Sequence, residues 1–457
     1  MTAKTNLVPQ TKAARSSIHL TDTGNGKIFA HRHGQDVRFC HDSKKWLMWD
    51  GRRWVPDRTG EINRRAKETA IHMMHSATRL KDVDRQHSLV KHALKSQYES
   101  RIRAMIALAQ SEPGISVTEA DLDSDQWLLN VQNGTLNLKT GQLGQHRREA
   151  LLTNLAPVEY DKKALCPVWD SFLTDIMGGD NNLIRFVQKA IGYSLTGSTR
   201  EQVFFILYGP GANGKSTFIA AIHLLLGDYA LSTPTETLLV KSGSGIPSDV
   251  ARLKGARFVS AVESEHGRKL AEALVKQLTG GDKITARHLY GEWFDFDPTF
   301  KLFLAVNHKP VIKGSDYAIW RRIRLVPFTV TIPPEKRDKD LINKLKAELP
   351  GILRWAVEGC MLWQREGLES PDSVKAATGD YQSEMDVIGD FIAECCDVVP
   401  DAKTPFKDLF FKYTLWSSKD GDDCLDQKEF ARGLAERSFT SGKNKALGRY
   451  RSGIRLK

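Results

Sequence analysis

Apolar residues occur along the chain in two patterns, short continuous runs and longer stretches with helical spacing. Four runs have the length of strands and lie at 204–207, 257–262, 301–306 and 323–326. Runs of this kind are typical of strands covered on both faces, and helical stretches separate them. We therefore expect an α/β core at 169–335, whose first segment, 169–195, is amphipathic and helical.

The first third of the chain has a mixed pattern. Apolar and polar residues alternate over 37–54 around Asp50-Gly51, which predicts short strands joined by a hairpin turn. Helical periodicity follows over 62–109, and the Asn133-Gly134 turn within 128–138 indicates a second hairpin. These features predict an N-terminal α+β domain at 19–168, after a disordered, basic lead-in at 1–18.

The remainder of the chain is expected to be a helical extension at 336–384 and a small separate domain at 385–457. Aromatic residues available for the core of that domain are Phe410, Phe411, Tyr413 and Trp416. Its last segment, 443–457, carries six basic residues and no acidic one. That pattern is compatible with a solvated tail or with a surface that contacts a polyanion.

Composition narrows the class of protein. Lys and Arg outnumber Asp and Glu by 66 to 55, giving a net charge of +11 that suits a polyanionic partner. No apolar span has membrane length and the first residues lack the apolar core of a signal peptide, so we expect a cytoplasmic protein with no membrane partner. The six cysteines are scattered without C-x-x-C spacing, which argues against a zinc ribbon or a disulfide scaffold.

The clearest chemical motif, Gly-Pro-Gly-Ala-Asn-Gly-Lys-Ser at 209–216, lies between the first buried run and a helical stretch. This G-x-x-x-x-G-K-[ST] spacing predicts a loop that binds the phosphates of a nucleoside triphosphate. Lys215 would contact the β- and γ-phosphates and Ser216 would ligate Mg²⁺, with Thr217 the weaker candidate. The expected nucleotide-binding residues are Gly209, Pro210, Gly211, Ala212, Asn213, Gly214, Lys215, Ser216 and Thr217. The expected cofactors are ATP and Mg²⁺.

Hydrolysis also needs a carboxylate near the metal and a group that activates water. Glu263 and Glu265 follow the second buried run, where both tasks are commonly performed. We assign Glu263 to the Mg²⁺ ion with its water shell and Glu265 to water activation, and the reverse order stays open.

Two further positions follow or precede buried runs. Asn307 follows the third run, and its amide could bond both a γ-phosphate and the attacking water. An asparagine that caps a turn is the alternative. Arg321 and Arg322 precede the fourth run and are candidates for stabilising the nucleotide of a neighbouring subunit, with surface ion pairs as the alternative.

In this order the motifs resemble those of a superfamily 3 helicase, in the phage and plasmid primase-helicase branch that includes the poxvirus-type nucleoside triphosphatases. The resemblance covers roughly residues 20 to 330 and is carried by 49–51, 133–141, 209–216, 263–265, 276–287, 307–310 and 320–322. It implies an AAA+-like P-loop core, a small C-terminal winged-helix-like DNA-binding domain, and a homo-oligomeric, hexameric ring that translocates on single-stranded DNA.

The resemblance also implies a pore-lining hairpin at 284–296 and an arginine finger at Arg321 or Arg322, of which we favour Arg322. The implied DNA contacts are Lys283, Arg287, His288 and Tyr290. Relatives often carry an N-terminal primase, but residues 1–170 are short for such a domain. We therefore expect no primase activity in this chain and a separate primase as a partner.

Together these features predict an ATP-dependent DNA helicase of a phage, prophage or plasmid replicon, acting on single-stranded and forked DNA. One alternative is an origin-binding initiator whose ATPase switches assembly without processive unwinding. A third interpretation, a P-loop enzyme such as a small-molecule kinase that needs no nucleic acid, leaves the hairpin and the arginine pair without a purpose.

Overall fold

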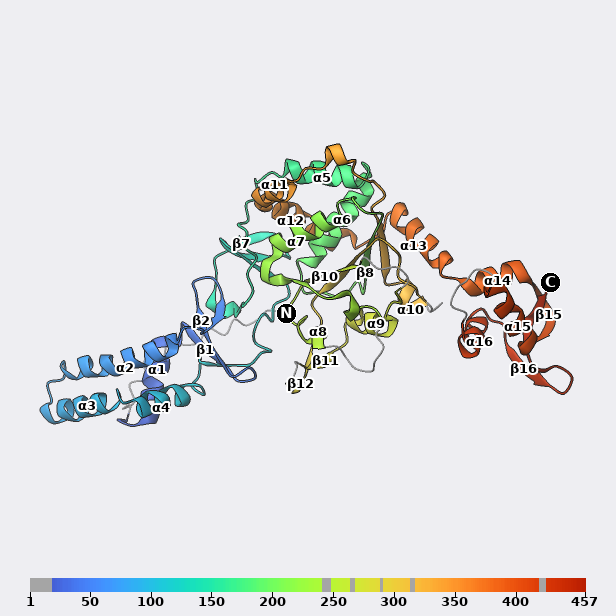
Figure 1. The fold of residues 1–457 in the computed structure, drawn as a ribbon. Helices are drawn as coiled ribbons and strands as arrows, with labels where there is room; N and C mark the ends of the chain where they lie inside the picture. Colours follow the sequence, from blue (N-terminus) through green and yellow to red (C-terminus); the bar gives the residue numbers. More distant parts are fainter. Residues whose placement is uncertain (1–18, 241–247, 264–267, 288–290, 313–316, 419–424) are drawn as a thin grey trace. The chain divides into compact units, whose positions relative to one another are not determined.

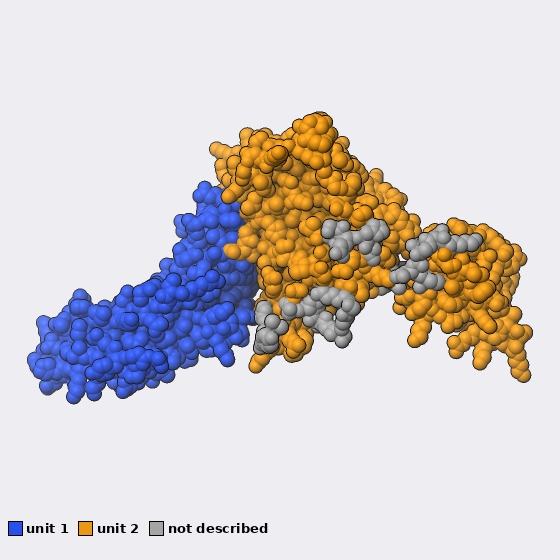
Figure 2. Space-filling model, viewed as in Figure 1, with its two compact units in different colours: residues 1–137, 142–159 blue, residues 138–141, 160–457 orange. Residues whose placement is uncertain are grey.

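The computed structural model describes residues 19–240, 248–263, 268–287, 291–312, 317–418 and 425–457, and it has a mixed α/β architecture (Figure 1). The chain divides into two compact units (Figure 2). Unit 1 comprises residues 1–137 and 142–159, and unit 2 comprises 138–141 and 160–457. Within the described ranges, no helix combines the length and the apolar composition that crossing a membrane requires.

In its described residues, unit 1 contains four α-helices and two small sheets. The helices are α1 (Asp22–His33), α2 (Glu61–Ala77), α3 (Val83–Lys95) and α4 (Glu99–Ala109). The first sheet has the order β3-β2-β1-β4, from β1 (Val37–Cys40), β2 (Lys45–Trp49), β3 (Trp54–Pro56) and β4 (Ser116–Val117). The second sheet has the order β5-β6-β7, from β5 (Leu128–Val131), β6 (Gly134–Asn137) and β7 (Gln142–Gly144). Both expected hairpins are therefore confirmed.

Helix α1 was not predicted from the sequence. Its apolar positions are few, and two buried glycines, Gly24 and Gly26, contribute to the face that packs inward. A Cβ on Gly26 would lie 3.2 Å from the backbone nitrogen of Ala109 on α4. Close backbone contact replaces the apolar stripe by which such a helix is usually recognised.

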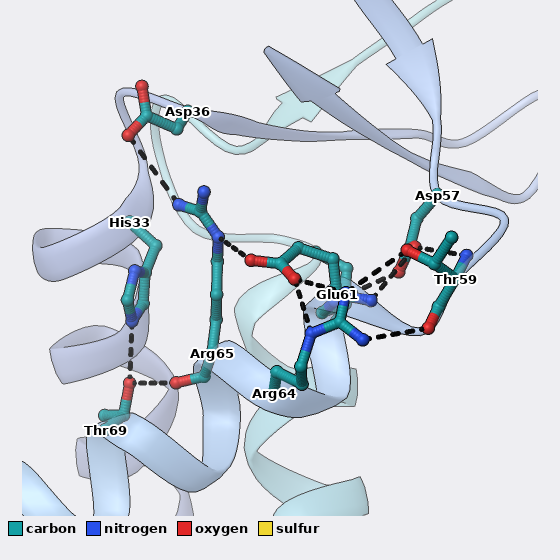
Figure 3. Close-up of polar contacts among 9 residues, drawn as sticks. His33, Asp36, Asp57, Thr59, Glu61, Arg64, Arg65 and Thr69 are labelled. Atoms are coloured by element: carbon teal, nitrogen blue, oxygen red, sulfur yellow. Dashed lines mark hydrogen bonds and ion pairs between the residues drawn. The ribbon is translucent and has the colours of Figure 1, made fainter. Parts of the chain in front are cut away.

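Polar contacts at the start of α2 fix its junction with the first sheet (Figure 3). The Asp57 carboxylate accepts the backbone N–H groups of Thr59, Glu61 and Ile62. Burial alone would raise the pKa of Asp57. The hydrogen bonds from these N–H groups have the larger combined effect and hold the pKa below its usual value. Glu61 in turn pairs with Arg65 at 3.2 Å. The Asp57 charge is thus engaged by the first turn of α2.

Unit 2 is built on a five-stranded parallel sheet with the order β14-β8-β13-β10-β9. Its strands are β8 (Phe204–Tyr208), β9 (Ala230–Ser232), β10 (Phe258–Glu263), β13 (Lys301–Val306) and β14 (Ile323–Pro327). Four of them lie at the four expected apolar runs. The edge strand β9 was missed because three residues are too few to show a pattern.

Helices cover both faces of this sheet (Figure 1). One face packs on α6 (Asn181–Ser194) and α7 (Lys215–Leu226), with α5 (Pro167–Ile176), α11 (Leu341–Ala347) and α12 (Leu349–Glu366) against those helices. The other face shares a core with α8 (Ser248–Ala251), α9 (Glu272–Gly280), α10 (Tyr317–Trp320), α13 (Asp372–Glu384) and the hairpin of β11 (Ile284–Arg287) and β12 (Trp293–Phe296). Consecutive strand residues such as Phe204 and Phe205 therefore enter different apolar layers.

Residues 387–456 have a core of their own. Their elements are α14 (Val387–Cys395), β15 (Cys396–Pro405), α15 (Phe406–Ser417), α16 (Gln427–Glu436), β16 (Ser441–Asn444) and β17 (Gly448–Leu456), with an antiparallel sheet of order β15-β17-β16. Tyr413 is buried there, and Phe410 and Trp416 pack against the core. The expectation for Phe411 is wrong, because this side chain is 65% exposed on the outer face of α15.

Lys301, the first residue of β13, is a buried cation at the amino end of the sheet. Its ammonium donates to the carbonyl groups of Thr196, Ser198 and Thr299, and it lies 4.7 Å from the centre of the Tyr193 ring. Burial lowers the pKa of this amine well below its ordinary value. Lys301 therefore ties the segment after α6 to the sheet by satisfying buried carbonyls.

Replacing Lys301 with Met should lower the free energy of unfolding by about 2–4 kcal/mol, because three carbonyls lose their shared donor. The matched control is Lys346→Met on the exposed side of α11, which should stay within about 0.5 kcal/mol of wild type. Chemical denaturation followed by circular dichroism measures both. Equal stability of the two variants would show that the buried amine contributes nothing.

Candidate active site at the carboxyl end of the parallel sheet

The loop at 209–214 joins β8 to α7, and its curl is fixed by close packing. Gly214 has φ +82°, and a Cβ there would lie 2.5 Å from Cγ2 of Ile176. A Cβ on Gly209 would lie 2.1 Å from the carbonyl oxygen of Phe328. Ala212 has φ +60°, a left-handed conformation that is uncommon outside glycine and recurs in ligand-binding loops. This backbone path therefore requires glycine at two of its positions.

Lys215, the first residue of α7, folds back over the loop. Its ammonium donates to the carbonyls of Gly209 at 2.6 Å and Pro210 at 3.4 Å, and to Oδ1 of Asn213 at 3.0 Å and Asn307 at 3.1 Å. The residue is 6% exposed, and desolvation lowers the pKa of the amine to about 8. These four partners are neutral oxygens, so an anion entering the loop would break no ion pair between Lys215 and the described side chains.

The first turn of α7 adds backbone donors to this site. The leading N–H groups of a helix have no intrahelical acceptor and lie at the positive end of its dipole. This turn contains no acidic residue to offset that charge. Ser216 is exposed and Thr217 is half-buried in it, while Gly211 and Ala212 of the loop are exposed. The arrangement suits an anion with several oxygen atoms.

The parallel register brings two other expected site residues to this edge. Val306 pairs with Tyr208, and Glu263 pairs with Val306. Asn307 therefore follows the strand beside the loop, and Glu263 ends the next strand, roughly 10 Å from β8 across two strand spacings. The side chain of Glu263 and the whole of Glu265 lie outside the described part of the chain.

Arg321 and Arg322 lie at the other end of the sheet. They precede β14, whose first residue, Ile323, pairs with Phe204, whereas the loop follows the last residue of β8. The strand length between them is roughly 15 Å. Arg322 is 8% exposed and donates to the carbonyl of Ala318 at 2.5 Å. Arg321 is exposed and donates to Oε1 of Gln202 at 2.9 Å.

The expected hairpin at 284–296 is present as β11 and β12, and its two faces differ in exposure. Ile284, Ala286 and Phe296 are buried in the core on the opposite side of the sheet from α7. Arg287 is exposed, and its guanidinium lies 4.9 Å from the centre of the Trp293 ring. One face of the hairpin thus anchors it and the other offers a cation beside an aromatic ring.

Of the other expected DNA contacts, Lys283 is exposed just before β11, whereas His288 and Tyr290 lie outside the described ranges. Trp293 was not predicted, although it is 56% exposed and directly opposite Arg287. Alternation within the hairpin could have indicated it, because cross-strand partners share a face.

Lys309 is a second residue that sequence reasoning missed. Its ammonium binds both carboxylate oxygens of Glu384 on α13 at 2.7 Å and lies 5.0 Å from the centre of the Tyr208 ring. The hydroxyl of Tyr381, also on α13, donates to the carbonyl of Pro310. The segment that follows Asn307 is therefore fastened to α13 by an ion pair and a buried hydrogen bond.

Metal-binding potential is limited in the described residues. They contain no group of three or more His, Cys, Asp or Glu side chains placed to hold a metal ion. A Mg²⁺ ion in this site would need Ser216, Glu263, water and oxygens of a ligand, the mixed coordination that is usual for Mg²⁺ with phosphates.

Two family models match parts of the chain. Residues 26–178 match the family described as D5 N terminal like, and residues 207–322 match a family of unknown function, DUF5906. The second match contains the loop, the end of β10, Asn307 and the arginine pair.

Viral relatives align with much of the chain. "Putative helicase L207/L206" of Acanthamoeba polyphaga mimivirus is 28% identical over 353 residues, 71% of this chain and 36% of that protein. "Putative helicase 022R" of Frog virus 3 is 29% identical over 261 residues, 52% of this chain and 27% of that protein. "Putative primase C962R" of African swine fever virus (isolate Tick/Malawi/Lil 20-1/1983) is 23% identical over 211 residues, 44% and 22% respectively. The aligned part is about a third or less of each relative.

Among solved structures, the apo structure of the NrS-1 C terminal region (305–718) has a TM-score of 0.50 and 10% identity, covering 94% of this chain and 99% of that one. At this identity the likeness concerns the fold alone. Together with the family match at 26–178, the viral relatives support a D5-like relationship for this chain.

Proposed function

We propose that this chain is a Mg²⁺-dependent ATPase of superfamily 3 type that moves along single-stranded DNA as a replicative helicase. The observation that carries the proposal is the position of Lys215, held by loop carbonyls and by Asn307 from the adjacent strand. The names of the mimivirus and Frog virus 3 relatives agree with a role of this kind.

In the proposed nucleotide complex, Lys215 exchanges neutral oxygens for phosphate oxygens, which form stronger, charge-assisted hydrogen bonds. Asn307 then loses Lys215 as a donor, and its amide becomes available to the γ-phosphate and the attacking water. Ser216 and Glu263 are assigned to Mg²⁺, which would screen charge on the phosphates. Glu265 remains our candidate for activating water.

The separation of the arginine pair from the loop supports a role between subunits. A guanidinium at the amino end of β14 cannot reach a nucleotide at the carboxyl end of its own sheet. In a ring, the same group could stabilise charge on the nucleotide of a neighbour. Arg321 is exposed whereas Arg322 is held against its own α10, so the geometry favours Arg321 for the finger although motif position favours Arg322.

DNA contacts are assigned to the hairpin, with Lys283, Arg287 and Trp293 on described positions and His288 and Tyr290 beside them in sequence. Exposed cations next to an aromatic ring suit a single strand, because phosphates and bases can be bound together. The proposal also includes assembly as a hexameric ring, forked DNA as the substrate and a separate primase as a partner.

A second candidate, an origin-binding initiator, is favoured by residues 387–456. Their order of helix, strand, two helices and two strands is that of a winged helix, and the β16–β17 hairpin carries the exposed cations Lys443, Lys445 and Arg449. A hollow of about 400 Å³ beside it is lined by Lys443, Arg449 and Tyr450. Such a surface would bind duplex DNA through its phosphates.

Lys215→Ala should reduce DNA-stimulated ATP turnover by at least about 100-fold and abolish strand displacement, because the β- and γ-phosphates lose their point charge. The exposed Lys346→Ala on α11 is the matched control and should retain activity. Circular dichroism checks the fold of both. Wild-type unwinding by Lys215→Ala would overturn the helicase assignment, and turnover that single-stranded DNA never stimulates would favour a small-molecule enzyme.

Nucleotide affinity should fall about tenfold from pH 7 to pH 9. The free-chain pKa of Lys215 is lowered to about 8, so the amine is mostly protonated at pH 7 and mostly neutral at pH 9, whereas phosphate contact would keep it protonated in the complex. Calorimetry of Mg-ATP binding across this range, in buffers of different ionisation enthalpy, measures affinity and proton uptake. Lys215→Arg should bind more weakly but with a flat profile; a flat wild-type profile would contradict the assignment.

Mixing Arg321→Ala protein with Lys215→Ala protein should restore ATPase activity if the finger acts in trans. Random co-assembly in equal amounts leaves about a quarter of interfaces with an intact loop and an intact arginine, so recovery should approach about a quarter of wild-type turnover. Arg322→Ala in the same mixture tests the other arginine. Absence of rescue by either variant at all mixing ratios would count against a shared site.

A further inference from the structure

Unit 1 contains a hollow of about 600 Å³ that is remote in sequence from the nucleotide loop. Three segments line it: the start of β2, the stretch from the end of β3 into α2, and α4. The lining residues that matter here are Lys44, Lys45, Trp46, Arg58, Asn63 and Arg103. A volume of this size accommodates a single nucleotide.

The hollow has an excess of positive charge. Lys44, Lys45 and Arg58 are exposed, and none makes an ion pair with another residue of the described ranges. Arg103 is also exposed and pairs with Glu99, one turn earlier on α4. Exposed pairs of this kind contribute little, so the guanidinium remains available to a stronger anion.

The only carboxylate among the described residues that line the hollow is Asp57, which does not neutralise these cations. Its oxygens are occupied by the backbone N–H groups at the start of α2 (Figure 3). The same contacts hold the loop that carries Arg58 in place, because Thr59 is one of the donors. The Asp57 carboxylate therefore holds the loop in place, and the cations of the hollow stay available to a ligand.

Beneath the cations the hollow is apolar. Trp46 is half-buried, and its ring packs against Phe39 with centres 5.2 Å apart and against Phe29 at 6.0 Å. Ile62 and Ile106 lie on the same lining. Trp46 is therefore held rigidly by its neighbours, a suitable surface for a flat ring from a ligand.

We propose that this hollow binds one nucleotide unit of single-stranded DNA. Lys44, Lys45, Arg58 and Arg103 bind the phosphates on either side, and the base packs on Trp46 within reach of the Asn63 amide. Cations around an aromatic surface are the usual means of holding a single strand without strong sequence preference. The proposal goes beyond the ATPase site, because this contact needs neither hydrolysis nor the β11–β12 hairpin.

The test uses the full chain carrying Lys215→Ala, so that the outcome does not depend on the nucleotide site. Fluorescence anisotropy with a labelled 20-nucleotide oligothymidylate, in the absence of ATP, measures affinity at several salt concentrations. Lys45→Glu with Arg58→Glu should weaken binding by about tenfold or more. The slope of log affinity against log salt concentration should also fall by about one for each cation removed. Thermal melting confirms that the variant is folded.

The matched control is Lys67→Glu with Lys91→Glu, which makes the same change of charge at exposed positions of α2 and α3 outside the hollow. It should weaken binding by less than about threefold. Equal losses in the two double variants, or no loss in either, would overturn the proposal. Competition by thymidine monophosphate would instead identify a site for free nucleotide. A change of oligomeric state by light scattering in the hollow variant alone would identify an interface between copies of the chain.

Discussion

The candidate site depends on a buried cation whose described partners carry no charge. The Lys215 ammonium sits among four neutral oxygens at the carboxyl end of β8, and the lowered pKa of its amine expresses the cost of that burial. The loop can hold this arrangement because glycine at 209 and 214 lets the backbone approach where any Cβ would collide. A bound polyanion would form charge-assisted hydrogen bonds with this ammonium, and this is the physical basis of the proposed phosphate site.

Strand β13 connects that site to the rest of unit 2. It lies between β8 and β10, with Lys301 buried at its amino end and Asn307 just beyond its carboxyl end. Lys309, two residues further on, binds Glu384 of α13, and α13 leads to the elements at 387–456. A change in the partner of Asn307 would therefore begin two residues from a contact with α13. In the proposed nucleotide complex, this continuity is a physical route from the loop to the C-terminal elements.

The sequence predicted the parts of the fold that local patterns determine. Apolar runs located four strands of the parallel sheet, and the motif located the loop because its glycines and lysine are contiguous. Sheet order was not predictable from those runs, so the assignment of Asn307 to the site rested on its place after a buried run and on motif order, and its contact with Lys215 was not predicted. Helix α1 was missed because glycines replace its apolar stripe, and Phe411 was misassigned because composition does not reveal which face of α15 is buried. The contacts of Lys309 join residues 75 apart, and no local signal reports such a pair.

The positions of the cations are more informative than the net charge, because some cations lie beside aromatic rings. Arg287 beside Trp293 on the β11–β12 hairpin and the cations around Trp46 in unit 1 belong to two different parts of the fold. A duplex shields its bases, so a ring beside a cation gains most from a strand whose bases are open. The β16–β17 hairpin differs, because its exposed cations Lys443, Lys445 and Arg449 suit the regular phosphates of a duplex. We therefore propose a fork as the substrate, because it presents open bases and a regular duplex in one molecule.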